Sequence, residues 1–153
     1  MQDGKFSVKL KPCTPEIALS VGQNLRWEDR REAEDLTGLT GEAAIVESYY
    51  GSTDCWYIEN PNGKIAGVVG VTPQNLIWML CTEASTEYPY AFVKRGRRLI
   101  KSLKNPYLCN MVDMRNESHV KFLKLLGFKF LRYYVYKGVP IIEFIKLCAP
   151  HSQ

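Results

Sequence analysis

Residues 116–128, NESHVKFLKLLGF, decide the fold expected for this chain. Asn116 is a good helix N-cap, because its side-chain oxygen can accept a free backbone N–H of the first turn. Glu117 then places a negative charge where the helix dipole favours it. Apolar side chains follow at helical spacing, at Val120, Phe122, Leu123 and Leu126. The stretch therefore predicts an amphipathic helix that ends at Gly127, with Phe128 starting a strand.

The composition is that of an ordinary folded protein. The chain has 153 residues, of which 46% are hydrophobic and 24% charged, and its net charge is +4. These values predict one domain, residues 1–153, with a single sizeable core. The mild positive charge permits an anionic ligand without requiring one. No apolar run approaches the ~20 residues that cross a membrane, and the start, MQDGKFSVKLK, lacks a signal core. We therefore expect a cytoplasmic protein.

The cysteines and histidines predict neither disulfides nor a metal site. The two histidines, His119 and His151, have no cysteine nearby, and no CxxC pair occurs. Isolated cysteines in this setting are expected to be reduced thiols. The five are Cys13, Cys55, Cys81, Cys109 and Cys148.

The order of predicted elements favours a mixed α/β (α+β) domain around one central sheet. Helices are expected at 15–21, 26–36, 41–51, 90–104 and 116–126, and strands at 6–10, 55–59, 64–71, 76–81, 107–114, 129–136 and 139–147. The second to fourth strands are separated by short turns and predict an antiparallel meander.

The asparagine, the eleven-residue step and the Gly-Phe pair of 116–128 resemble the helix-turn signature of the GNAT superfamily of acyl-CoA-dependent N-acyltransferases. The whole chain resembles small GNAT-like proteins encoded by tailed bacteriophages, some of them virion proteins. The matching positions are Asp29, Glu32, Ser48, Gly63, Gly70, Val71, 78–82, Phe92, Asn110, Val112, Asp113, Asn116, Leu123, Gly127 and Phe128.

The resemblance implies a mostly antiparallel sheet of six to seven strands, with splayed middle strands and helices on both faces. It also implies that acetyl-CoA enters the gap between those strands. A backbone N–H of the 78–82 strand would hold the thioester carbonyl, and the loop 82–90 would hold the pyrophosphate, as helix N-termini hold anions. The implied cofactor-binding residues are Leu80, Cys81, Thr82, Arg95, Arg98 and Asn116.

Two departures from the family pattern concern the reaction. The usual glycine-rich pyrophosphate motif is missing, since Gly96 stands alone in VKRGRRLIKSL. Many relatives place a tyrosine acid seven residues after the asparagine, where this chain has Leu123. Transfer would then need Ser118, a tyrosine from another strand, or solvent as the acid.

The resemblance makes Glu32 the candidate base that removes a proton from an amine. It lies with Glu28 and Asp29 in a segment that also holds several arginines, so a charged helix face is the competing interpretation. His119 follows Asn116 by one turn. A single helix histidine of this kind is expected to pack or to face solvent.

Basic residues on the 90–104 helix form its main electrostatic feature. Five share one face by helical spacing: Lys94, Arg97, Arg98, Lys101 and Lys104. A solvated face, contacts with CoA phosphates and binding of nucleic acid all remain open for this surface.

The leading hypothesis is an N-acetyltransferase that moves acetyl from acetyl-CoA to an amine of a protein or small molecule. By resemblance it would be encoded by a phage and act in the cytoplasm of the bacterial host. The alternative is a catalytically weak or inactive GNAT-fold binding or virion protein that contacts a host or phage protein. An oligomer formed through the closing strands remains open.

Overall fold

The computed structural model describes residues 7–148. The helices are α2 (Pro15–Gln23), α3 (Trp27–Thr37), α4 (Gly41–Tyr50), the 3-10 turn η1 (Glu83–Thr86), α5 (Pro89–Ser102) and α6 (Glu117–Leu125). The strands are β1 (Lys9–Pro12), β2 (Asp54–Glu59), β3 (Ile65–Val71), β4 (Ile77–Cys81), β5 (Tyr107–Asp113), β6 (Lys129–Tyr136) and β7 (Val139–Leu147).

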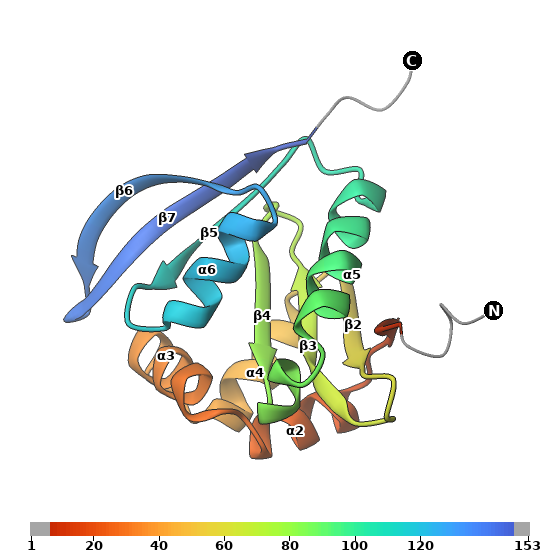
Figure 1. Ribbon diagram of the computed structural model, residues 1–153. Coiled ribbons are helices and arrows are strands. Elements are labelled where there is room, and N and C mark those ends of the chain that lie inside the picture. The colour runs from red at the N-terminus through yellow and green to blue at the C-terminus, as the bar shows by residue number, and fades with distance from the viewer. Residues whose placement is uncertain (1–6, 149–153) are drawn as a thin grey trace.

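The strands form two sheets that meet edge to edge at β4 and β5. The first has the order β1-β2-β3-β4 and the second the order β5-β7-β6, and every pairing within each sheet is antiparallel. Between the sheets the structure records one parallel bridge, from Leu76 to Cys109, beyond which β4 and β5 diverge (Figure 1). The predicted mixed α/β fold with a splayed centre is thereby confirmed.

Local sequence signals explain where the first helices begin and end. Thr14 caps α2 by accepting a hydrogen bond from the Ile17 N–H at 3.2 Å. Thr40 caps α4 in the same way through the Ala43 N–H. Gly38 ends α3 in the left-handed conformation, with φ of 74°, which a glycine adopts without strain.

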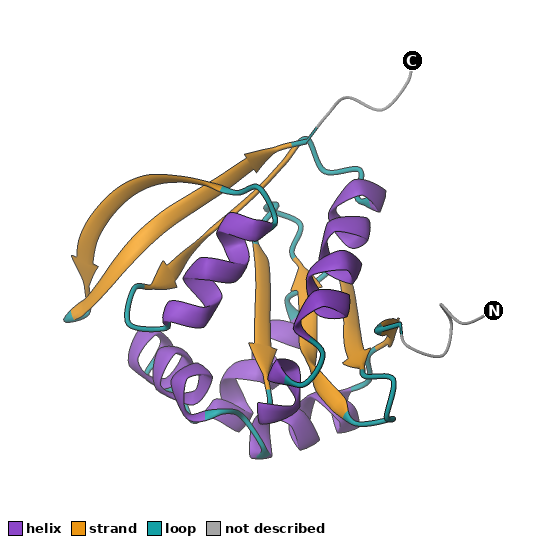
Figure 2. Cartoon of the chain, viewed as in Figure 1, coloured by secondary structure: helices purple, strands orange, loops and turns teal. Residues whose placement is uncertain are grey.

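Helices cover both faces of the sheets (Figure 2). A core of apolar side chains lies on each side. On one face α5 and α6 pack over apolar side chains that include Val69, Leu108 and Phe144. On the opposite face α2 and α4 pack over a second set that includes Ile45 and Val68. The alternation of side chains along β3 and β4 supplies both cores from the same strands.

Three sequence expectations need adjustment. The helix expected at 90–104 ends at Ser102, and Leu103 turns to an extended conformation and is buried. Asn116 does precede α6, but its side chain makes no capping hydrogen bond, because it is engaged elsewhere in the interior. The first strand lies at Lys9–Pro12 rather than 6–10, and Phe6 falls outside the described residues.

Within residues 7–148, no helix is both long and apolar enough to cross a membrane.

Candidate functional site

Two carboxylates of α3 close the wide end of the gap between β4 and β5. Asp29 Oδ2 accepts the backbone N–H of Cys81, at the end of β4, at 2.7 Å. Glu32 Oε2 accepts the backbone N–H of Asp113, at the end of β5, at 3.2 Å. The two acids are one helical turn apart, so α3 presents one to each strand. The diverging strands thus keep hydrogen-bond partners where they no longer pair with each other.

Arg26 and Asn116 connect these carboxylates into one network. Arg26 Nη1 donates to Asp29 Oδ1 at 2.6 Å and to Asn116 Oδ1 at 3.2 Å. Asn116 Nδ2 donates to Asp29 Oδ1 at 3.0 Å and to Glu32 Oε1 at 2.8 Å. Asp29 and Asn116 have no exposed surface at all. We call Arg26, Asp29, Glu32, Asn116 and His119 the gap cluster.

His119 joins the gap cluster from the first turn of α6. Its Nε2 lies 3.2 Å from Asp29 Oδ2. Burial alone would lower the pKa of His119, but the negative charge of Asp29 and the hydrogen bond to it hold that pKa well above the ordinary value. The carboxylate of Asp29 therefore favours the protonated imidazole, which can release its proton to a stronger base.

The two carboxylates have opposite pKa shifts. Burial raises the pKa of Asp29, but the charges of His119 and Arg26 and the hydrogen bonds from His119 and Asn116 together bring it below its usual value. For Glu32, burial is the larger effect and raises the pKa above its usual value, against the charge of His119 and the hydrogen bond from Asn116. Glu32 is thus the more basic of the two carboxylates.

A groove rich in basic residues lies on the α5 and α6 side of β4. It has a volume of about 800 Å³, and the residues of 7–148 that line it include six lysines or arginines and no carboxylate. We call it the basic groove. Its basic residues are Arg26, Lys94, Arg97, Arg98, Lys101 and Lys121, and its other walls come from Met79, Cys81, Ser85, Thr86, Pro89, Tyr90, Phe92, Val93, Ser118, His119, Phe122 and Leu125.

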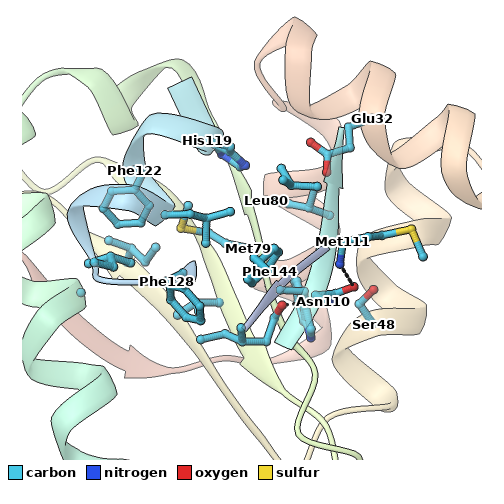
Figure 3. A pocket seen from close by; sticks show the side chains of 18 of the residues that line it. Glu32, Ser48, Met79, Leu80, Asn110, Met111, His119, Phe122, Phe128 and Phe144 are labelled. Carbon is cyan, nitrogen blue, oxygen red and sulfur yellow. Dashed lines mark hydrogen bonds between the residues drawn. The ribbon is translucent and has the colours of Figure 1, made fainter. Parts of the chain in front are cut away.

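A second cavity, of about 340 Å³, passes through the gap. Its walls include Glu32 and Ala33 of α3 and Ser48 of α4 on one face of the sheet, and Phe92 and Phe122 of α5 and α6 on the other. Figure 3 shows Glu32 and His119 on either side of its upper end. We call this space the inner cavity.

Four residues line both the basic groove and the inner cavity: Met79, Phe92, His119 and Phe122. Two ligands that enter from opposite sides of the sheet could therefore meet beside His119. This is the arrangement that a transfer between two substrates requires, because the reacting atoms must come within about 3–3.5 Å.

Met79 is the β4 residue whose backbone faces the gap. In and around β4, the even-numbered residues turn their backbone N–H and C=O groups toward β3. Two hydrogen bonds indicate this: Leu76 O accepts from the Thr72 N–H, and the Thr82 N–H donates to Ala66 O. Of the odd-numbered ones, Ile77 O accepts from Asn110 Nδ2 and the Cys81 N–H donates to Asp29. Met79 lies between them, so its N–H points into the gap.

The predicted backbone donors Leu80, Cys81 and Thr82 have protein partners or face β3. The Thr82 N–H donates to Ala66 O at 2.9 Å, and the Cys81 N–H donates to Asp29. The Leu80 backbone lies opposite Val68 of β3. The Cys81 side chain lines the basic groove, whereas that of Leu80 lines the inner cavity.

The other predicted site residues fall into three places. Arg98 and Ser118 line the basic groove, whereas Arg95 lines the inner cavity. Glu32 lines the inner cavity and belongs to the gap cluster. Asn116 lines neither space, and its side chain holds Asp29 and Glu32 in position.

Gly96, the isolated glycine of the basic helix, lies where α5 and α6 approach each other. A Cβ at this position would be 3.0 Å from Leu126 Cδ2 and 3.2 Å from Phe122 Cζ. Its small size is therefore explained by helix packing.

The sequence interpretation did not select three residues that the geometry brings forward. Asp29 was considered with its acidic neighbours, His119 was expected to pack or face solvent, and Met79 was passed over in favour of Leu80–Thr82. Two signals were present: acids one turn apart in α3, and a histidine one turn after Asn116. Neither signal indicates that α3 and α6 contact each other in the fold.

Comparison with known proteins supports the fold. No protein-family model matches the chain, and neither does any curated protein. Among solved structures, the spermidine N-acetyltransferase of Vibrio cholerae in complex with CoA and spermine is similar, with a TM-score of 0.67 and 11% identity over 92% of this chain and 95% of that one. A GNAT-family acetyltransferase of Streptococcus pneumoniae has a TM-score of 0.58 and 17% identity over 94% and 100%. At these identities the similarity shows a GNAT fold.

Proposed function

We propose that this protein is an N-acetyltransferase that takes acetyl from acetyl-CoA and delivers it to an amine. One observation carries the proposal: the basic groove and the inner cavity meet at His119 and Met79, inside the gap between β4 and β5. A fold used by acetyltransferases raises the expectation of this reaction, but the argument rests on the residues of the site.

The basic groove fits CoA, whose phosphates carry several negative charges. Lys94, Arg98, Lys101 and Lys121 line it, and no carboxylate there would repel the cofactor. At the start of α5 the first intrahelical bond is donated by the Phe92 N–H. The preceding N–H groups, those of Tyr90 and Ala91, have no acceptor within the helix and can serve an anion even without the glycine-rich motif.

Acetyl-CoA supplies an activated thioester carbonyl. In the proposed arrangement the Met79 N–H donates to that carbonyl oxygen and stabilises the charge that develops on it. This refines the assignment of the role to Leu80–Thr82, since the N–H groups of Cys81 and Thr82 already donate to Asp29 and Ala66.

Glu32 and His119 have pKa shifts suited to opposite proton transfers. Glu32, which lines the inner cavity and has a raised pKa, would accept the proton of the incoming ammonium group. His119, protonated at neutral pH, would donate a proton to the departing thiolate. His119 would thus take the role of the tyrosine that Leu123 replaces. Ser118, on the basic groove, would act as a hydrogen-bonding neighbour.

Cofactor binding and turnover test the proposal separately. Acetyl-CoA in large excess over its Kd should raise the melting temperature, corresponding to a few kcal/mol of stabilisation. Release of free CoA, followed with a thiol reagent, should depend on added amine and fall by about 10²–10⁴-fold in His119→Gln. Absence of any thermal shift at millimolar acetyl-CoA would overturn the proposal.

A second candidate is a GNAT-fold protein that acts through contact with another protein. It is favoured by the missing tyrosine and by the apolar surface of β6, where Tyr133 is 66% and Val135 70% exposed. By the sequence resemblance, the partner would be a phage or bacterial host protein and the setting the host cytoplasm or a virion. Acetyl-CoA binding without any amine-dependent CoA release would favour this candidate.

A further inference from the structure

We propose that the acceptor is a primary amine with a single positive charge on an apolar body, and that polyamines are poor acceptors. This inference rests on the proposed acetyltransferase function. It concerns the part of the inner cavity on the α3 and α4 side of the sheet, which lies across the gap from the basic groove.

Glu32 gives this part its negative charge, and its other walls are mostly apolar, with hydroxyl groups at Thr37 and Ser48. Glu32 is the only carboxylate among the described residues that line the inner cavity. The facing walls are formed by Ala33, Leu36, Ala44, Trp78, Leu80 and Met111. Figure 3 shows Glu32 at one end, with Leu80 and Met111 along the side. One ammonium group can pair with Glu32, and the rest of the molecule would lie against hydrocarbon.

Nearby acids cannot serve a second ammonium group. Asp29 is fully buried, and its oxygens already accept from Arg26, Asn116 and Cys81. Asp113 is also fully buried and is held by Arg115. A second cationic nitrogen within the cavity would therefore lose its hydration without gaining a partner, which is unfavourable.

Arginines outside the cavity further disfavour a long polycation. Arg115, which holds the buried Asp113, also pairs with the exposed Asp35 at 2.8 Å. Arg31 stacks on Trp27, with 4.3 Å from its guanidinium carbon to the ring centroid, and donates to the Arg115 carbonyl. Arg31 and Arg115 thus place positive charge on this side of α3.

Ser48 gives the far end of the cavity one polar group. Its side chain is seen at the end opposite Glu32 and His119 (Figure 3), and Asn110 and Met111 line the same cavity. A hydroxyl at the distal end of an aromatic amine could hydrogen-bond there. The favoured acceptor is therefore an arylalkylamine, with a phenolic hydroxyl tolerated at the far end.

A panel of three amines tests the acceptor class. With acetyl-CoA held at saturation, kcat/KM should be higher for 2-phenylethylamine and tyramine than for spermidine, by about 100-fold or more. Ser48→Ala should lower the ratio of tyramine to 2-phenylethylamine by about 3- to 10-fold, because one hydrogen bond to a neutral group is lost.

A charge-adding variant tests the cause of the selectivity. Met111→Glu places a second carboxylate on the wall of the cavity. It should lower the ratio of kcat/KM for 2-phenylethylamine to kcat/KM for spermidine by about 10-fold or more. Met114→Glu is the matched control, because Met114 is exposed and does not line the cavity, and it should leave the ratio unchanged. An acetyl-CoA thermal shift confirms that each variant is folded and binds the cofactor.

The outcomes separate this inference from the function on which it rests. A clear thermal shift with spermidine as the best acceptor, or with none of the apolar amines acetylated, would overturn the acceptor class alone. No shift with acetyl-CoA would overturn the acetyltransferase function, and the acceptor class with it.

Discussion

Asp29 and His119 form a contact of 3.2 Å between α3 and α6, helices that the chain separates by seven other elements. The aspartate has no exposed surface, and its negative charge raises the pKa of the imidazole. The same carboxylate fixes the end of β4 through the Cys81 N–H. One buried acid therefore sets both the shape of the gap and the protonation of the residue proposed to act there.

Removing the charge of Asp29 should strongly destabilise the fold. Asp29→Asn leaves Arg26 without its buried partner, and loss of one member of such a pair costs about 3–5 kcal/mol. Urea unfolding followed by circular dichroism would measure the change. Asp35→Asn is the matched control, because its pair with Arg115 is partly exposed and should contribute about 1 kcal/mol or less. Equal effects in the two variants would contradict the role given to Asp29.

The stabilising contribution of the His119 charge should depend on pH in one direction. Its pKa is higher in the folded than in the unfolded protein, so the contribution is fully present below about pH 6.5 and disappears as the pH rises through the folded-state pKa. The stability difference between wild type and His119→Gln should therefore shrink toward alkaline pH. A difference that grows with pH would exclude a charged His119 in the folded state.

Activity should follow a bell-shaped pH profile. On the acidic side kcat/KM should rise as Glu32 loses its proton, above the ordinary glutamate pKa because burial raises it. On the alkaline side it should fall as His119 loses its proton, well above pH 6.5. His119→Gln should remove the alkaline limb and keep the acidic one. A profile with both limbs intact in this variant would assign the acid to another group.

Glu32→Gln should reduce turnover while leaving cofactor binding in place. Removal of a general base lowers kcat by about 10²–10⁴-fold, and the amide keeps an oxygen that can accept from Asn116 or Asp113. The acetyl-CoA thermal shift should persist, since Glu32 does not line the basic groove. Turnover at the wild-type rate would exclude Glu32 as the base.

Arg98 should contribute to CoA affinity, and Lys104 should not. Arg98 lines the basic groove, and loss of a charged hydrogen bond to phosphate weakens binding by roughly 10-fold or more. Lys104 follows α5 and lies off the groove, so Lys104→Ala should change the Kd by about 2-fold or less. Calorimetric titration with CoA at two salt concentrations would measure both. An equal loss in the two variants would indicate only a general effect of charge.

The sequence predicted the elements well because local signals mark them. Thr14 with Pro15, Thr40 and Gly38 define helix ends through contacts within a few residues. The splayed sheet followed from the family resemblance. The site itself depends on contacts such as Asn116 with Glu32, which are 84 residues apart. No periodicity of the sequence indicates that pairing, so the sequence does not predict that Asn116 and His119 belong to one network with Asp29.

Because the two sheets meet only at their edges, the chain can be divided into two consecutive segments. Each segment contains all the described strands of one sheet. Residues up to Cys81 supply every strand of one sheet, and residues from Tyr107 supply every strand of the other. A backbone break at Asn105, between α5 and β5, would interrupt no strand pairing. The first fragment would carry Asp29, Glu32 and Met79, and the second Asn116 and His119, so neither could form the site alone. Mixing the two fragments would recover the proposed acetyl transfer only when they associate, which would allow association of the fragments to be followed by activity.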